Sequence, residues 1–161
     1  MKPLTADEAY NRLAARCAAS EQCRKDLAAK LYAWKIAHDT AEQILDRLET
    51  EHYLDEGRYS LALARDKARF DGWGSLKIRQ ALYQKGIPSS CIEQALRGVE
   101  DTIYEEQAIR LLKAKSRSLT PNDPQRYAKL ARYLASRGFE PERIRRLLKT
   151  YDPEAEDTWM F

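Results

Sequence analysis

The sequence is poor in residues that favour strands and has no long apolar run. Val occurs once in 161 residues, and only six glycines and six prolines interrupt the chain. Since β-branched residues favour strands, this scarcity argues against a sheet-based fold. No apolar run approaches the roughly 20 residues that a membrane-spanning helix needs, and the first ten residues lack the apolar stretch of a signal peptide. We therefore expect a cytoplasmic protein.

Residues that carry catalysis or hold metals are also sparse. The only two histidines, His38 and His52, have no second ligand at helical spacing. The three cysteines, Cys17, Cys23 and Cys91, are odd in number and lack CxxC spacing, so we expect buried helix residues and not a disulfide framework or a zinc site. The glycine pair in "DGWGS" does not follow a strand, as a phosphate-binding loop would. The sequence thus predicts neither an enzyme nor a cofactor.

What the chain has instead is a helical pattern that recurs. Ala, Leu, Arg, Lys and Glu abound, and these residues lose little side-chain freedom in a helix. The stretch "ALYQKGIPSSCIEQAL" (81–96) returns 52 residues later as "YLASRGFEPERIRRLL" (133–148), with apolar residues on one helical face and a glycine that ends the first helix. A fainter copy lies 51 residues before the first. Lys35 occupies its glycine position, so we expect that helix to end differently.

Each copy also has a leading helix, which makes nine helices in all. The sequence therefore predicts an all-α protein of three tandem three-helix repeats, spanning residues 1–52, 53–99 and 100–151. Since such short repeats cannot bury their apolar faces alone, we expect them to stack into an elongated, curved helical solenoid.

Three local expectations accompany this pattern. Asp39 or Thr40 should cap the helix that runs to about Glu51. Phe70, with Tyr59 and Leu63, should face inward on the leading helix of the second repeat. The acidic tail 152–161, which ends in Trp159-Met160-Phe161, could dock into a partner pocket or simply fray.

Positive charge is concentrated in the second and third repeats. Residues 1–56 hold eight Lys and Arg against eleven Asp and Glu, residues 57–97 hold eight against three, and residues 110–149 hold twelve against three. This asymmetry indicates an anionic partner, and arginine binds phosphate through two parallel hydrogen bonds. A solvated face of scattered cations is the alternative. The candidate binding residues are Arg58, Arg65, Arg69, Lys77, Arg79, Lys85, Arg126, Lys129, Arg132, Arg137, Arg143, Arg145 and Arg146.

Aromatic residues lie among these cations. They could stack on bases, but at helical spacing we expect core packing for most of them. Trp73 is different because it stands between two glycines in a loop, where packing between repeats and contact with a ligand are equally good explanations. The residues concerned are Tyr59, Phe70, Trp73, Tyr83, Tyr127 and Tyr133.

The stretch "HYLDEGRYSLALARDKARFDGWGSLKIRQALYQKGI" (52–87) resembles the central motif of the RecX family, small bacterial regulators of the recombinase RecA. The closing "YLASRGFEPERIRRLL" is similar to the family's C-terminal signature. Glu56, Trp73 and Ser75 depart from the usual pattern. The central match is carried by Tyr53, Leu54, Arg58, Tyr59, Gly72, Gly74, Lys77, Ile78, Leu82, Lys85, Gly86 and Ile87.

The resemblance implies a tandem helical-repeat protein that binds the RecA–single-stranded DNA filament as a monomer. It implies that the protein modulates, and mostly inhibits, the recombinase, ATPase and co-protease activities of RecA in DNA repair and the SOS response. Contacts to DNA phosphates would be independent of sequence, since no groove-reading motif is present. The alternative is a helical-repeat scaffold that binds proteins without direct DNA contact.

Overall fold

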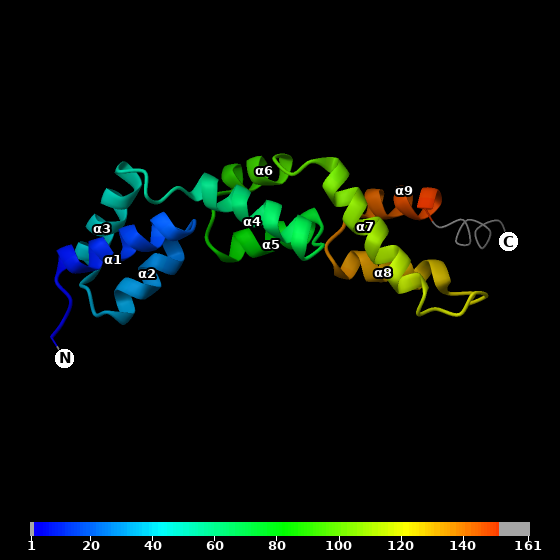
Figure 1. Ribbon diagram of the computed structural model, residues 1–161, viewed down its shortest axis with the longest axis horizontal. Helices are drawn as coiled ribbons and strands as arrows, with labels where there is room; N and C mark the ends of the chain where they lie inside the picture. The colour runs from blue at the N-terminus through cyan, green and yellow to red at the C-terminus, as the bar shows by residue number, and fades with distance from the viewer. Residues whose placement is uncertain (1, 152–161) are drawn as a thin grey trace. The chain divides into compact units, whose positions relative to one another are not determined.

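A computed structural model describes residues 2–151, and within this range the chain forms nine helices and no strand (Figure 1). The predicted all-α repeat fold is confirmed, while the curvature of the solenoid and the repeat boundaries stay predictions. The helices are α1 (Ala6–Ala19), α2 (Arg24–Ala33), α3 (His38–Thr50), α4 (Glu56–Phe70), α5 (Ser75–Gln84), α6 (Ser89–Arg97), α7 (Asp101–Ser116), α8 (Arg126–Ser136) and α9 (Pro141–Tyr151).

The chain divides into two compact units. The first unit contains residues 1–62 and 82–95, and the second contains residues 63–81 and 96–161. The division passes through α4, α5 and α6, so the middle three helices contribute to both units.

The first unit is built around α3, against which α1 and α2 both pack. The Thr5 hydroxyl caps α1 by accepting the backbone N–H of Glu8 at 3.1 Å. Helix α1 turns Ala9, Leu13 and Cys17 into the core of this unit, where all three are buried. Burying each large aliphatic side chain stabilises the fold by about 1.5–3 kcal/mol. The core also includes Leu27, Leu31, Ile44, Leu45 and Leu48.

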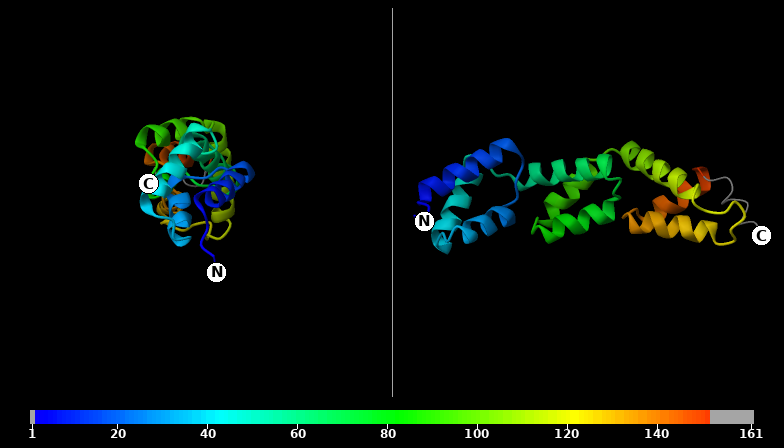
Figure 2. Two further views of the ribbon diagram at one scale, coloured as in Figure 1. Left: turned by 90° about the vertical axis from the view of Figure 1, so that its left-hand side faces the viewer. Right: turned by 60° about the horizontal axis from the view of Figure 1, so that its bottom comes forward.

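In the second unit α7, α8 and α9 pack against one another in pairs (Figure 2). Helix α9 begins at Pro141, because the fixed backbone angle of proline suits a first helical turn. The apolar positions of these three helices and of the turn before α9 form a buried core. Those of α7–α9 are Ala108, Leu111, Leu112, Leu130, Leu134, Phe139, Ile144, Leu147 and Leu148.

Helices α2, α5 and α8 all end in the same way. In each, a backbone N–H beyond the last turn donates to a leucine carbonyl five residues earlier: Ile36 to Leu31 at 3.0 Å, Ile87 to Leu82 at 3.2 Å and Phe139 to Leu134 at 3.2 Å. The residue just before each donor has a positive φ, 62° at Lys35, 72° at Gly86 and 94° at Gly138.

Lys35 therefore closes its helix as the glycines do, and the prediction that the first copy ends differently is wrong. A residue with a Cβ takes this left-handed conformation at a cost of about 1–2 kcal/mol. The closure satisfies carbonyls at the end of α2 that would otherwise lack a partner. Tertiary context thus imposes the repeat's geometry on a residue that disfavours it.

Three further local predictions are wrong. Helix α3 begins at His38 after Ala37, which makes no side-chain cap, so Asp39 and Thr40 lie inside the first turn. Phe70 is 72% exposed because it is the last residue of α4. Tyr83 is 75% exposed, against the expectation of core packing. The tail with Trp159-Met160-Phe161 lies outside the described residues.

The described residues contain no helix long and apolar enough to cross a membrane, and no group of three His, Cys, Asp or Glu side chains placed to hold a metal ion. Cys17 and Cys23 are buried, as expected, and Cys91 is half-buried. His38 and His52 are exposed.

Candidate nucleic-acid interface

Two of the predicted basic residues join parts of the first unit. At the start of α4, Arg58 donates to the Glu21 carboxylate at 3.1 Å and to the His52 carbonyl at 2.8 Å. At the end of α5, Lys85 pairs with Asp26 at the start of α2, at 3.0 Å. These contacts are partly exposed, and each contributes little to stability, about 0–1 kcal/mol. Both cations are nevertheless occupied by protein partners.

The loop "DGWGS" packs against the end of α8 in the second unit. Gly74 donates its backbone N–H to the Arg137 carbonyl at 2.8 Å, and Leu76 donates to the Gly138 carbonyl at 2.9 Å. A Cβ at Gly74 would lie 2.4 Å from the Gly138 carbonyl carbon, so only glycine permits this contact. The motif serves backbone packing, which agrees with its exclusion as a phosphate loop.

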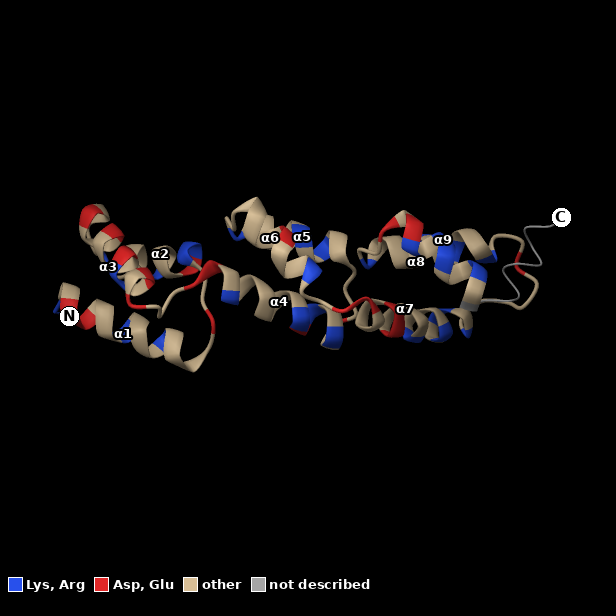
Figure 3. Cartoon of the chain, turned by 90° about the horizontal axis from the view of Figure 1, so that it is seen from above, with Lys and Arg blue, Asp and Glu red and all other residues tan. Residues whose placement is uncertain are grey.

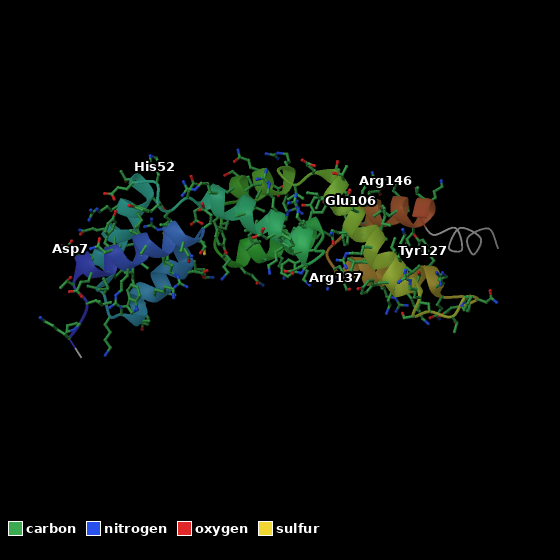
Figure 4. All side chains as sticks on the ribbon, in the orientation of Figure 1. Asp7, His52, Glu106, Tyr127, Arg137 and Arg146 are labelled. Atoms are coloured by element: carbon green, nitrogen blue, oxygen red, sulfur yellow. The ribbon has the colours of Figure 1, made fainter. Side chains whose placement is uncertain are left out.

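We call this contact between the loop and the end of α8 the joint at Gly74. The side chain of Arg137, at the end of α8, also takes part in it (Figure 4). Its guanidinium donates to the backbone carbonyl of Asp71. Beside it, the Ser75 hydroxyl donates to the Glu140 carboxylate at 2.7 Å. Arg137 is thus a structural residue of the joint.

Two arginines of α9 hold that helix against α7. Arg143 pairs with Asp101 at 2.8 Å and lies 5.2 Å from the centre of the Tyr104 ring, and its side chain is only 18% exposed. Arg146, labelled in Figure 4, pairs with Glu105 at 3.1 Å. Arg146 keeps an exposed side chain, so it can still present charge.

The remaining predicted residues differ in their exposure. Arg126 is buried, with 6% of its surface exposed, and Arg79 and Lys77 are half-buried. Arg145 is exposed beside Glu142, at 3.2 Å on the same helix. The freest cations are Arg65 and Arg69 on α4, which are exposed and make no ion pair with a described residue, and Arg132 on α8, whose only described hydrogen bond is a 3.4 Å contact to the Ala128 carbonyl.

Trp73 packs between two lysines of the second unit. The ammonium groups of Lys67 and Lys77 lie 4.9 and 4.6 Å from the centre of its ring. Each such cation–π contact is worth about 0.5–1 kcal/mol at an exposed site. Both lysines belong to the second predicted repeat, so these contacts lie within it, and the choice between packing across repeats and contact with a ligand stays a prediction.

A basic surface depression of about 450 Å³ lies where α7 ends and α8 begins. We call it the α7–α8 depression, and its lining residues are Lys115, Gln125, Lys129, Arg132 and Tyr133. The Lys115 ammonium lies 5.4 Å from the centre of the Tyr133 ring. Lys115, Gln125 and Tyr133 are absent from the predicted set, because sequence shows their charge or shape but not their convergence.

One carboxylate lies beside the depression. Asp123 pairs with Lys129, and this hydrogen bond lowers the pKa of the Asp123 carboxyl below its ordinary value. Asp123 therefore stays ionised at neutral pH and neutralises Lys129. Lys115 and Arg132 form no ion pair with any residue between positions 2 and 151.

Charge of the opposite sign lies along α3 (Figure 3). Glu42, Asp46 and Glu49 surround the guanidinium of Arg24, at 2.7, 2.9 and 2.9 Å. Although burial disfavours the charge of Arg24, these hydrogen bonds raise its pKa. Arg24 is therefore neutralised by carboxylates of α3, unlike the unpaired cations of α4 and α8.

Comparison with known proteins now adds to this geometry. Two family models match, described as the second three-helix domain of RecX over residues 55–96 and the third over residues 103–148. The chain is 37% identical over 125 residues to the "Regulatory protein RecX" of Xanthomonas citri, covering 78% of this chain and 76% of that protein. It is 35% identical over 152 residues to the protein of the same name from Ectopseudomonas mendocina, covering 93% and 97%.

A solved structure has the same fold. The crystal structure of RecX from Lactobacillus salivarius superposes with a TM-score of 0.83, covering 91% of this chain and 96% of that one, at 20% sequence identity. At this identity the similarity bears on the fold alone.

Proposed function

The chain belongs to the RecX family of regulatory proteins, and from this premise we propose that it regulates RecA by binding the RecA–single-stranded DNA filament. We propose further that it binds as a monomer in the cytoplasm and inhibits the recombinase, ATPase and co-protease activities of RecA. No catalytic step by this chain is needed, because occupying the filament is enough to change the activity of RecA.

One observation carries the DNA part of this proposal: some exposed cations form no ion pair with any described residue. Arg65, Arg69 and Arg132 are exposed without an ion pair to a described residue. Unpaired positive charges repel one another and destabilise the fold, unless an anionic partner neutralises them. Phosphate contacts are the natural partner, since each releases condensed counterions. The structural arginines, Arg137 and Arg143, would support this surface without touching DNA.

The alternative remains a protein-binding scaffold without DNA contact. It is favoured by the ion pairs of Arg58, Lys85, Arg143 and Arg146, which reduce the free positive charge below what the sequence indicates. Under this reading the exposed cations would face acidic residues of RecA.

The experiment measures binding to RecA assembled on single-stranded DNA, together with the rate of ATP hydrolysis by RecA. The variant pair is Arg65→Ala with Arg69→Ala, and the matched control is Arg16→Ala with Lys30→Ala, which removes two unpaired cations from the first unit. We expect the test pair to weaken filament binding and inhibition several-fold, and the control pair to have little effect. A native chain that neither binds the filament nor alters ATP hydrolysis at low salt refutes the proposal.

Salt dependence distinguishes DNA contact from the scaffold. For single-stranded DNA the logarithm of the binding constant falls with the logarithm of salt concentration by about 0.7 per phosphate contacted. On bare single-stranded DNA, removal of two contacts should lower that slope by about 1.4. Filament binding without any binding to bare DNA at low salt would favour the scaffold.

A further inference from the structure

The α7–α8 depression combines two features that separately occur on many surfaces: unneutralised cations and a half-buried aromatic ring. Resting on the proposed function, we infer that it receives one nucleotide of a single strand. The phosphates on either side contact Lys115 and Arg132, and the base stacks against Tyr133. This assigns a distinct subsite within the third three-helix domain, away from the exposed cations Arg65 and Arg69 of α4.

The charges select a phosphate-bearing ligand. Lys115, Lys129 and Arg132 line the depression, and only Lys129 is matched by a carboxylate, that of Asp123. Two positive charges are therefore left over, which matches the two phosphates that flank a nucleotide within a strand. Arg132 adds a planar fork that binds phosphate oxygens in pairs.

The ring selects a base over a bare phosphate. Tyr133 is half-buried within α8, so part of its surface is accessible, and the Lys115 ammonium, 5.4 Å from the ring centre, moves aside from the face on which a base stacks. Stacking of a base on an aromatic side chain is worth about 1–3 kcal/mol and tolerates any base.

Gln125 sets the limit on sequence preference. Its amide is the one neutral polar side chain among the lining residues. A single amide can donate to and accept from many base edges, so it gives weak discrimination. The subsite should accept all four bases with affinities that differ little.

The first test measures affinity for a short single-stranded oligonucleotide by fluorescence anisotropy, with the full chain and without RecA. Tyr133→Leu removes the aromatic face, and we expect binding to weaken about fivefold to a hundredfold. Tyr133→Phe keeps the ring and should bind as the native chain does. Equal affinities for the native chain and Tyr133→Leu, at unchanged melting temperature, overturn the inference.

The cations are tested through the salt slope. Lys115→Ala and Arg132→Ala should each lower it by about 0.7. Lys113→Ala is the matched control, because Lys113 is exposed on α7 but does not line the depression. A control that lowers the slope as much as Lys115→Ala would show diffuse attraction and would also overturn the subsite.

A third measurement locates the base directly and does not depend on a variant that might misfold. An oligonucleotide carrying 5-iododeoxyuridine is irradiated with the native chain, and the adduct is mapped by mass spectrometry. We expect an adduct at Tyr133. Adducts only elsewhere, or none despite binding, refute the subsite.

The outcomes separate this inference from the proposed function. Filament binding and inhibition that persist unchanged in Tyr133→Leu and Arg132→Ala, without a Tyr133 adduct, would end the subsite and leave regulation of RecA standing. A Tyr133 adduct in a protein with no effect on RecA would end the proposed function and leave the subsite standing.

Discussion

Replacing Lys35 by glycine should stabilise the protein. Lys35 has φ 62°, in the left-handed region that glycine occupies without steric cost. The same helix end in the other copies carries Gly86 and Gly138. The side chain of Lys35 forms no ion pair with a described residue, so its removal loses no identified contact.

The size of the gain follows from two opposing terms. Relieving the left-handed conformation gains about 1–2 kcal/mol. Glycine gives the unfolded chain more freedom, which costs about 0.4–1 kcal/mol. The net increase in the free energy of unfolding is then about 0.5–1 kcal/mol, equivalent to a rise in melting temperature of about 1–4 °C for a chain of this size.

The assay is thermal and denaturant unfolding followed by circular dichroism, with Lys30→Gly as the control. Lys30 lies inside α2, where glycine should destabilise by about 1 kcal/mol. The two substitutions make the same chemical change five residues apart and should move stability in opposite directions. A fall in stability for Lys35→Gly would show that the lysine side chain contributes something the helix-end geometry does not reveal.

Three further outcomes follow. Gly138→Ala should destabilise the chain by more than Gly86→Ala, as measured by denaturant unfolding. Both glycines have a positive φ, but a Cβ at Gly138 would lie 2.6 Å from the Lys77 backbone nitrogen, whereas the nearest atom to a Cβ at Gly86 is a flexible lysine carbon 3.9 Å away. Equal losses of stability would contradict this reasoning. Tyr104→Phe should raise the free energy of unfolding by about 1 kcal/mol, since the buried Tyr104 hydroxyl has no hydrogen-bond partner among residues 2–151; a loss of stability would reveal a partner. Burial raises the pKa of Glu56 above its ordinary 4.5, so the folded state holds the proton more tightly than the unfolded state does. The free energy of unfolding therefore falls as pH rises from about 4.5 through the folded pKa. The stability gained by Glu56→Gln should be larger at pH 8 than at pH 4.5, and a gain independent of pH would contradict a raised pKa.

The repeated apolar positions made the fold predictable, because each unit must bury the same stripe. Leu31, Leu82 and Leu134 occupy one register and are all fully buried. The ends of elements were less predictable. Phe70 carries the right residue type for a core, but the helix stops there and the ring is exposed.

The basic residues show a different limit. Sequence counts Arg143 and Arg132 as equal charges, yet one pairs with Asp101 from another helix and the other has no carboxylate partner in the described chain. An ion pair between residues 42 positions apart leaves no local signal in one sequence. The sequence therefore revealed the excess of positive charge in the third repeat. It did not reveal which cations form ion pairs within the protein and which are left to bind a partner.

Helix α5 takes part in two joints, which differ in whether backbone or side-chain groups form the contact. Gly74 permits backbone hydrogen bonds to the end of α8, where any Cβ would clash at 2.4 Å. In the repeat register, the equivalent position 51 residues earlier holds Cys23, whose side chain is fully buried. There the end of α5 meets α2 through side chains instead, with the Lys25 ammonium donating to the Gln84 carbonyl at 2.7 Å and Lys85 pairing with Asp26 at 3.0 Å.

This difference explains part of the uneven charge. Lys85 is held in a partly exposed ion pair, which salt weakens, whereas the joint at Gly74 depends on backbone hydrogen bonds that salt barely affects. The charged side chains of Arg137 and Glu140 also take part in the joint at Gly74, but each contacts a neutral partner there. The third repeat, which contributes Gly138 to that joint, also provides Lys115 and Arg132, neither of which pairs with a carboxylate in the part of the chain described.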